Sequence, residues 1–364
     1  VAQSHLGEKE LAVTPPGPPS ALTPKPGSLR DPAKKLTGTT GPEAEAVRAL
    51  VAELGQSDRP VVLGPWVGDV GAELLYWIPF LAWARHTGAI DPDRLVVVSR
   101  GGTASWYRHL TSRYVDLYDL VTPADLARRA TGRGGHGATA ANATSADQDL
   151  VDLASKAAGI TDPLVLHPST MYALFEAFWS RRVPITLIEA FTSFSPLTPP
   201  ELGDLRRHLP DRFLTARFYA NAGMPDSAQN RAFAAAYLAE VSRDIDVVLL
   251  NTTETFGDAR DLAHEAGPRV HLMSSLMTPA TSLDVQTRVI AASEGFVGTY
   301  GGLAFVAPFS GRPALTFQSH ASTFRFDHFD VARRVFAGMT PGGLVRLDVR
   351  ASDLLHTAFE VEGR

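Results

Sequence analysis

The sequence predicts an α/β protein of two consecutive domains, each built on a parallel sheet, with a cleft between them. Short apolar segments alternate with helical segments along most of the 364 residues, which is the rhythm of parallel sheets. The alternation is interrupted at the proline-rich segment 184–210, which we interpret as the crossing between the domains. At residues 298–302 an apolar strand runs into two glycines and then a helix, as at the ligand-binding edge of such sheets.

The first domain is expected over residues 43–195. Helices are predicted at 43–55, 73–86, 123–129, 149–158 and 170–179, and strands at 60–64, 95–99 and 164–167. Ala46, Leu50 and Leu54 form one apolar face of the first helix. Pro79 removes a backbone donor from the second helix and should kink or restart it.

The second domain is expected over residues 196–364. Strands are predicted at 213–219, 246–250, 270–273, 295–298 and 314–317, and helices at 227–243, 258–266, 282–293 and 303–310, before a closing helix, strand and helix. Residues 1–42 are rich in Pro, Gly, Thr and Lys without an apolar period, which predicts a disordered tail. Segment 132–146 is expected to be a mobile surface loop.

Composition excludes several classes of protein. Hydrophobic residues make up 45% and charged residues 20%, as in an ordinary globular protein, and a net charge of −5 argues against nucleic-acid binding. The absence of cysteine excludes thiol catalysis, disulfides and Cys-ligated zinc. No apolar run reaches the roughly 18 residues of a membrane span, and no signal pattern opens the chain, so a cytoplasmic protein is expected.

The turn at 298–302 carries the strongest signal for a ligand. Helix N-termini at the carboxyl ends of parallel strands offer backbone N–H groups and a dipole that suit phosphate. Gly301 and Gly302 allow close backbone approach, Thr299 adds a hydroxyl, and Tyr300 adds a ring or a phenol. The alternative is that the glycines serve only the geometry of the turn. Neither a GxGxxG nor a Walker A pattern is present.

Other predicted strands of the second domain also end in polar residues, which should converge on the same sheet edge. Arg217 ends an apolar strand, and its guanidinium calls for an anion, either a phosphate or a structural carboxylate. The full set of predicted donor-binding residues beyond the turn is Arg217, Tyr219, Asn251, Thr252, Ser274, Ser275, Ser319 and His320.

The first domain contains two candidates for a general base, Asp69 and Glu73, in the segment that joins its first strand to a helix. A carboxylate near aromatic rings has its pKa raised by desolvation, which suits proton abstraction. Trp66 and Tyr76 are the nearby aromatic candidates for acceptor binding. The alternative for both acids is capping and dipole compensation in the first helical turn.

Three further residues follow strands of the first domain. Arg100 is a candidate for holding an anionic group, and Trp106 for stacking on a sugar. His167 ends a third strand and is either a catalytic or a structural histidine. The spacing of Asp91 with Asp93, and of Asp244 with Asp246, is that of metal-bound nucleotide-sugar sites, but their positions favour caps and turns. No metal requirement is therefore predicted.

The C-terminal residues from Thr278 to Pro313, with the run 296–305 at their centre, resemble the donor half of GT-B glycosyltransferases. The Gly-Pro-Trp and Glu-Leu-Leu-Tyr-Trp-Ile-Pro-Phe runs at 64–80 also resemble these proteins. The chain is most similar to bacterial GT-B-like proteins, and it distantly resembles fucosyltransferases and heptosyltransferases. The resemblance spans roughly residues 60–340. It implies two Rossmann-like domains, the C-terminal one holding a nucleotide-diphosphate sugar and the N-terminal one an acceptor.

The resemblance implies an inverting, metal-independent transfer of a hexosyl or deoxyhexosyl group to a hydroxyl, with the nucleotide sugar as co-substrate and no other cofactor. Arg217 corresponds by position to the basic residue of the donor half, and 299–302 to the diphosphate-binding turn. A Glu late in the chain that binds the donor ribose in many relatives is not evident. The alternatives are a nucleotide-sugar epimerase and a non-catalytic sugar or nucleotide sensor.

Overall fold

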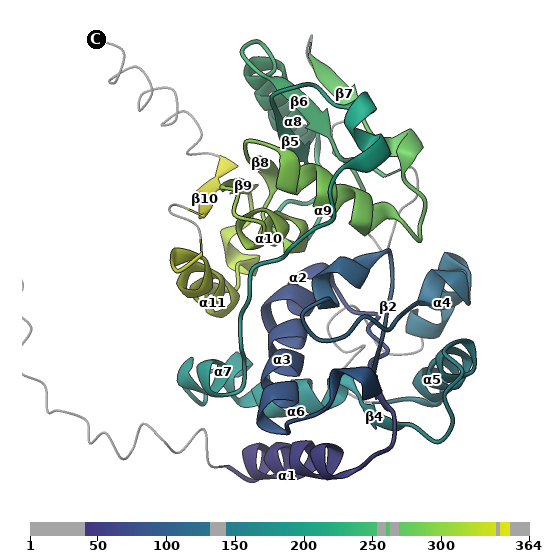
Figure 1. Cartoon of the computed structure of the whole chain (residues 1–364). Coiled ribbons are helices and arrows are strands. Elements are labelled where there is room, and N and C mark those ends of the chain that lie inside the picture. Colours follow the sequence, from purple (N-terminus) through teal and green to yellow (C-terminus); the bar gives the residue numbers. More distant parts are fainter. Residues whose placement is uncertain (1–40, 132–142, 253–259, 263–268, 340–342, 350–364) are drawn as a thin grey trace, which may run out of the picture. The chain divides into compact units, whose positions relative to one another are not determined.

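The computed structural model describes residues 41–131, 143–252, 260–262, 269–339 and 343–349, which belong to one compact unit (Figure 1). Most of the tail expected over 1–42 lies outside the described residues. So do most of the loop expected over 132–146, most of the helix expected over 258–266, and the helix expected to close the chain.

The first sheet has four parallel strands in the order β3-β2-β1-β4. Its strands are β1 (Val61–Leu63), β2 (Leu95–Ser99), β3 (Tyr114–Asp116) and β4 (Leu164–Leu166). The helical segments of this half are α1 (Pro42–Gln56), α2 (Val70–Ala72), η2 (Glu73–Trp77), α3 (Ile78–Thr87), η3 (Pro92–Arg94), η4 (Thr103–Tyr107), η5 (Leu117–Asp119), α4 (Pro123–Thr131), α5 (Ser145–Ala157), α6 (Pro168–Trp179) and α7 (Thr186–Ala190).

Both faces of the first sheet are covered by helices. Val61, Leu63 and Val97 on one face pack with α1, α3 and α6, because alternate strand residues point the same way. Val62 and Val98 on the other face pack with α4 and α5. Strands covered on both faces must be apolar throughout, which explains why the run Val-Val-Val in β2 is a strand.

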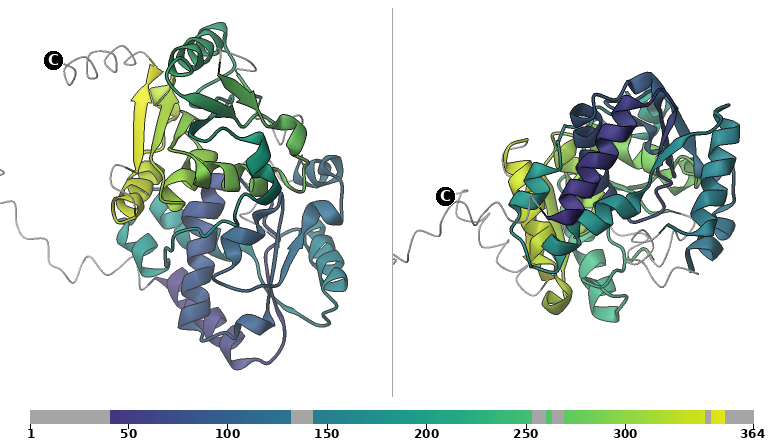
Figure 2. Two further views of the ribbon diagram at one scale, coloured as in Figure 1. Left: turned by 45° about the horizontal axis from the view of Figure 1, so that its top comes forward. Right: turned by 90° about the horizontal axis from the view of Figure 1, so that it is seen from below.

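The second sheet has six parallel strands in the order β10-β9-β8-β5-β6-β7, with β10 in yellow at one edge (Figure 2). Its strands are β5 (Phe213–Arg217), β6 (Asp246–Leu249), β7 (Val270–Leu272), β8 (Phe296–Thr299), β9 (Ala314–Gln318) and β10 (Leu344–Asp348). Its helical segments are η6 (Gly203–His208), α8 (Ala228–Val241), η7 (Ser274–Leu276), α9 (Ser282–Ala292), α10 (Gly302–Phe309), η8 (Ala321–Thr323) and α11 (Phe326–Ala337).

The second sheet is likewise covered on both faces. Phe296 and Ala314 pack in a cluster with residues of α9, α10 and α11, whereas Val297 and Phe317 pack with residues of α8. The fold class is therefore the predicted one, with two parallel sheets that each lie between layers of helices. The domain boundary expected near residue 195 stays a prediction.

Three local features differ from the sequence prediction. The strand β3 was not predicted, because Tyr114–Asp116 is short and its last residue is an acid. The predicted second helix begins at Val70 and contains a π-helical turn, η2, before α3 starts with Pro79 in its first turn, so the proline restarts the helix as expected. The crossing at 184–210 contains the helical segments α7 and η6.

We call the first sheet with its helices, α1 to α7, the first half, and the second sheet with its helical segments, η6 to α11, the second half. Residues of both halves pack in one hydrophobic cluster, which includes Leu74 and Trp77 from η2 with Ala304 and Phe305 from α10. The starts of α2 and α10 meet backbone to backbone: a side chain on Gly302 would collide with the amide nitrogen of Gly71. Elsewhere, the buried Trp106 Nε1–H donates to Thr287 Oγ1 of α9 over 3.0 Å. The two halves are thus held together at defined points.

Candidate functional site

The predicted donor-binding residues follow strands of the second sheet and lie at one edge, because all neighbouring strands are parallel. Tyr219, two residues after β5, lies close to the turn after β8. Its hydroxyl occupies the space in which a side chain on Gly301 would begin, so a larger residue at 301 would have to displace the Tyr219 ring. The structure therefore brings Tyr219 directly against the predicted diphosphate-binding turn.

The Thr299 hydroxyl fastens β8 to the end of β5. It accepts a hydrogen bond from the Tyr219 N–H and donates one to the Tyr219 carbonyl, both over 2.9 Å. Thr299 is fully buried. Its hydroxyl proton is thus committed within the protein, so the turn has the backbone amides of Gly301 and Gly302 to offer a ligand.

Arg217 is held in an ion pair. Its Nε donates to Asp261 Oδ1 over 3.0 Å, while its two other nitrogens donate to Gln286 Oε1 over 3.0 Å and to Thr252 Oγ1 over 3.2 Å. The residue is only 9% exposed. Of the two anions that the sequence left open for this guanidinium, the structure contains the carboxylate. Contact with a phosphate stays a prediction.

Tyr300 lies in an aromatic cluster with Phe305, Phe324 and Phe329. Burial raises the pKa of its phenol above the usual value, and its hydroxyl has no hydrogen-bond partner among the described residues. Its carbonyl accepts from Asn221 Nδ2 over 3.0 Å. Tyr300 therefore supports the turn mainly through packing.

The remaining donor-side candidates are arranged around neighbouring strand ends. Ser319 Oγ accepts from Asn230 Nδ2 over 2.9 Å, and the N–H groups of Ser319 and His320 both donate to the Gly223 carbonyl. Ser274 and Ser275 begin η7, and Asn251 is buried at the end of β6. Their contact with a donor stays a prediction.

Asp69 stands at the junction of α2 and α10. Its carboxylate caps α2 by accepting from the Ala72 N–H over 2.8 Å, and the residue is exposed. A side chain on Gly71 would lie 3.1 Å from Asp69 Oδ1 and 3.2 Å from Gly302 Cα. An accessible carboxylate from the first half therefore lies next to the start of α10 from the second.

The charge of Asp69 reaches side chains from three other elements. Burial raises the pKa of Tyr172 in α6, and Asp69 raises it further. Burial also raises the pKa of Tyr219 to about 12. The charge of Arg217 lowers this pKa, and the charge of Asp69 raises it. Burial lowers the pKa of His328 in α11, against the nearby charges of Asp327 and Asp69. The negative charge of Asp69 thus influences the pKa of two phenols and one imidazole from other elements.

Glu73 is a different kind of carboxylate, fully buried in η2. Oε1 accepts from Ser99 Oγ over 2.7 Å and from the Tyr107 hydroxyl over 2.6 Å, and Oε2 accepts from Arg100 over 3.0 Å. Burial raises the pKa of Glu73, against the opposing charge of Arg100. The predicted rise in pKa is present, but the carboxylate has no exposed surface at which it would meet an acceptor.

Arg100 connects the buried acid to the exposed one. One guanidinium nitrogen pairs with Glu73, and another donates to the carbonyl of Gly68, the residue before Asp69. The side chain is 12% exposed, and its pKa is raised by Glu73 in spite of burial. The residue expected to hold an anionic ligand therefore holds the loop that carries Asp69.

The predicted acceptor-side aromatic residues belong to the core. Trp66, Tyr76 and Trp106 are fully buried, so their faces are covered by protein. Trp66 stacks between Trp77 and Tyr172, with ring centroids 5.8 Å and 6.3 Å away. An apolar face that packs in a core and one that stacks on a sugar use the same residue types, which is why the sequence did not distinguish them.

His167 caps α6. Its Nδ1 accepts from the Ser169 N–H over 3.1 Å, and its Nε2 lies 3.7 Å from Asp147 Oδ2. This arrangement corresponds to the structural alternative for the histidine. Sequence reasoning missed Tyr172 and His328, whose pKa values the charge of Asp69 influences, and no local motif marks either of them.

Neither a metal cluster nor a membrane span is found in the part of the chain that the structure describes. No group of three or more His, Asp or Glu residues is placed there to hold a metal ion. In the pair Asp91 and Asp93, Asp91 caps η3. In the pair Asp244 and Asp246, Asp246 lies 2.7 Å from His271 Nε2, so one acid of each pair has a structural contact. No helix among these residues has the length and apolarity needed to cross a bilayer.

No family model and no curated protein matches the sequence. Among solved structures, the chain is similar to a family 9 glycosyl transferase from Veillonella parvula, with 10% identity, a TM-score of 0.47, and 84% of this chain and 90% of that chain covered. The glycosyltransferase SnogD from Streptomyces nogalater is 14% identical, with a TM-score of 0.39, and the match covers 81% of this chain and 88% of that chain. The ADP-heptose LPS heptosyltransferase II of E. coli is 12% identical, with a TM-score of 0.41, and the match covers 79% of this chain and 90% of that chain. These values assign no activity to the chain, and its α/β architecture rests on its own two sheets.

Proposed function

We propose that the protein is a metal-independent, inverting glycosyltransferase that moves a sugar from a nucleotide-diphosphate sugar to a hydroxyl, with Asp69 as the general base. One observation carries the proposal: an exposed carboxylate from the first half stands beside the glycine turn that starts α10 in the second half. A base and an anion-binding helix start are the two groups that displacement of a diphosphate by a hydroxyl requires.

The base acts on the acceptor. Asp69 accepts the proton of the acceptor hydroxyl, whose oxygen attacks the anomeric carbon of the donor as the bond from that carbon to the diphosphate oxygen breaks. Attack from the side opposite the leaving group inverts the configuration. Asp69 is accessible to an acceptor, whereas Glu73 is enclosed, so the structure favours Asp69 among the two acids.

The diphosphate is placed at the start of α10. The free backbone N–H groups in the first turn of a helix, together with the helix dipole, stabilise a negative charge that develops there. Gly301 and Gly302 add no side chains of their own at this helix start, and the Tyr219 hydroxyl and the backbone of Gly71 lie beside them. Arg217, already paired with Asp261, orders the neighbouring strand ends in this proposal.

Glu73 and Arg100 act as positioning residues. Arg100 bridges the buried carboxylate and the Gly68 carbonyl, so it fixes the backbone immediately before Asp69. A base that must lie within hydrogen-bond reach of a hydroxyl benefits from such a support, because small misplacements slow proton transfer. The buried network thus contributes to the rate without touching the substrates.

Nucleotide binding tests the donor half of the proposal. Thermal unfolding is measured with UDP, GDP, ADP, CMP and dTDP, and a ligand at 100 times its Kd should stabilise the native state by about 2.7 kcal/mol. The nucleotide that binds then identifies the donor sugars for turnover assays with and without EDTA. Transfer that survives EDTA supports the proposal. Binding of a nucleotide without cleavage of any of its sugar forms would contradict it.

A further inference from the structure

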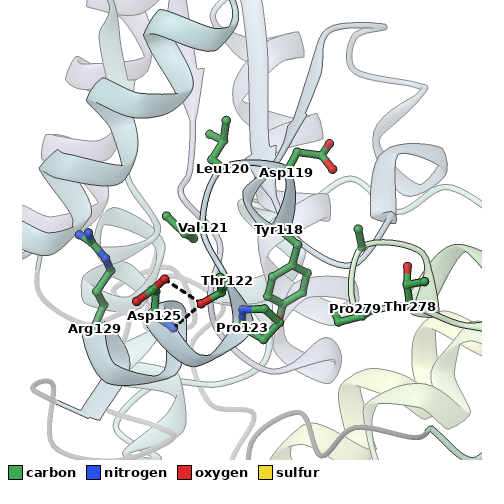
Figure 3. Close-up of a pocket in the computed structure, with 11 residues that line it drawn as sticks. Tyr118, Asp119, Leu120, Val121, Thr122, Pro123, Asp125, Arg129, Thr278 and Pro279 are labelled. Atoms are coloured by element: carbon green, nitrogen blue, oxygen red, sulfur yellow. Dashed lines mark hydrogen bonds between the residues drawn. The ribbon is translucent and has the colours of Figure 1, made fainter.

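A pocket of about 590 Å³ lies between the segment that follows β3 and the turn that precedes α9 (Figure 3). Its lining includes Tyr118, Asp119, Thr122 and Arg129 from the first half and Thr278 and Pro279 from the second. This volume is in the range of roughly 300–1,000 Å³ that small-ligand sites occupy. Both halves of the protein thus contribute to one cavity.

The pocket shares a sheet edge with Asp69 but is displaced from it. β3 lies two strands from β1 in the first sheet, about 10 Å at the usual strand spacing. Asp69 follows β1, and Tyr118 follows β3. The pocket therefore lies at the sheet edge at which the segment carrying Asp69 also emerges, and it is distinct from the glycine turn of α10.

The wall of the pocket is fixed before any ligand binds. Asp116 at the end of β3 accepts from the N–H groups of Tyr118 over 2.9 Å and of Gly102 over 2.7 Å. On the opposite side, the Thr278 N–H donates to Thr281 Oγ1 over 3.0 Å and closes the turn. A preformed wall lowers the ordering cost of binding.

The charges of the pocket select against anions. It contains two carboxylates, Asp119 and Asp125, and one guanidinium, Arg129, and Asp125 is ion-paired with Arg128. Arg129 lies 3.3 Å from Asp149, whereas the Asp119 carboxylate is exposed and takes part in no ion pair among the described residues. A phosphate would meet the negative charge of Asp119 here, while a hydroxyl or ammonium group would find its carboxylate as an acceptor.

The Tyr118 ring gives the pocket an apolar surface. Figure 3 shows the ring between Pro123 on one side and Pro279 on the other. Aromatic rings of this kind offer apolar area to the C–H face of a sugar while carboxylates and hydroxyls meet its polar edge. The hydroxyls of Thr122 and Thr278 are bonded to Asp125 and Thr281, so the ring and the Asp119 carboxylate are the groups that fit a sugar better than a nucleotide diphosphate.

We propose that this pocket binds the acceptor, and that the acceptor presents a hydroxyl-rich, sugar-like group without phosphate, either neutral or with an amine. That the bound group is the acceptor of a transfer reaction rests on the proposed function. The binding of such a group does not, because the pocket would hold it whether or not a donor is cleaved.

Saturation-transfer NMR on the full chain tests the proposal with glucose, galactose, mannose, rhamnose, glucosamine and glucose 6-phosphate. We expect at least one neutral or amino sugar to receive saturation, and glucose 6-phosphate to receive none. Tyr118→Ala should reduce the saturation-transfer signal several-fold. Asp119→Lys should weaken the binding of the amino sugar and allow glucose 6-phosphate to bind. The exposed Asp58 provides the matched control, since Asp58→Lys makes the same charge change elsewhere.

Three results would overturn the proposal: none of the sugars binds, glucose 6-phosphate binds the wild type better than glucose, or the signals survive Tyr118→Ala in a folded variant. Unfolding curves of each variant establish that it is folded. If sugars bind through Tyr118 but no nucleotide stabilises the protein, the pocket stands and the transferase proposal falls. If nucleotide sugars are cleaved but no sugar binds through Tyr118, the transferase proposal stands and the pocket proposal falls.

Discussion

Asp69 and Glu73 lie four residues apart on one segment and have opposite environments. Asp69 is exposed and accepts one backbone hydrogen bond at the start of α2. Glu73 is fully buried and accepts from Ser99, Arg100 and Tyr107. A general base needs access to its substrate and a free lone pair, whereas a structural carboxylate needs its lone pairs occupied. Asp69 therefore meets the requirements of the proposed base, and Glu73 meets those of a structural carboxylate.

The largest effect is expected when the buried member of the pair is removed. Glu73→Ala leaves the Arg100 guanidinium buried without its partner, which should lower the free energy of unfolding by about 3–5 kcal/mol. Asp69→Ala removes a helix cap and should cost about 1 kcal/mol. Denaturant unfolding measures both. If Glu73→Ala does not fold, Glu73→Gln should still be less stable than Asp69→Asn, and equal stability would contradict the comparison.

A methyl group at the junction should have the next largest effect. In Gly302→Ala the new Cβ would press on the backbone of Val70 and Gly71, which should cost roughly 1–3 kcal/mol of stability and displace the Asp69 loop from α10. The control is Gly338→Ala, where the new Cβ has its nearest contact at 3.7 Å. Unfolding curves and nucleotide binding report the two consequences. If Gly302→Ala matches the control, the close helix contact is not needed.

A smaller effect is expected at His328, which the charge of Asp69 reaches. Burial holds the pKa of His328 below its ordinary value of 6.5, so the unfolded chain binds more protons just below that pH. Stability should therefore fall as the pH drops through about 6.5, and His328→Gln should flatten this dependence. The exposed His86 supplies the control variant His86→Gln. An unchanged pH profile in His328→Gln would show that the histidine is not the titrating group.

The fold was largely predictable because strands buried on both faces leave continuous apolar runs in the sequence. The segment 95–99 was predicted as a strand and is β2, whereas Tyr114–Asp116 was missed because it is short and ends in an acid. The π-helical turn at Glu73 was also missed, since it depends on how η2 packs rather than on local propensity. The restart at Pro79 was predicted because proline acts through its own backbone.

The site was less predictable because its decisive contacts join distant residues. Sequence placed two acids on one segment, but Ser99 and Tyr107, which enclose Glu73, come from later elements. Trp66 and Trp106 were predicted as acceptor contacts because aromatic residues near glycines suit a sugar, and both are buried. Tyr118 and Asp119 were not predicted as binding residues, because the cavity that they line is formed together with Thr278 and Pro279, which are distant in the sequence.

The rate of transfer from the nucleotide sugar tests most directly whether the exposed Asp69 carboxylate is the base, as we propose. Asp69→Asn is compared with the wild type after nucleotide binding has shown that both hold the donor nucleotide equally well. We predict that Asp69→Asn lowers the rate by about 10²–10⁴-fold, the usual contribution of general base catalysis. Transfer at the wild-type rate in Asp69→Asn would contradict the assignment.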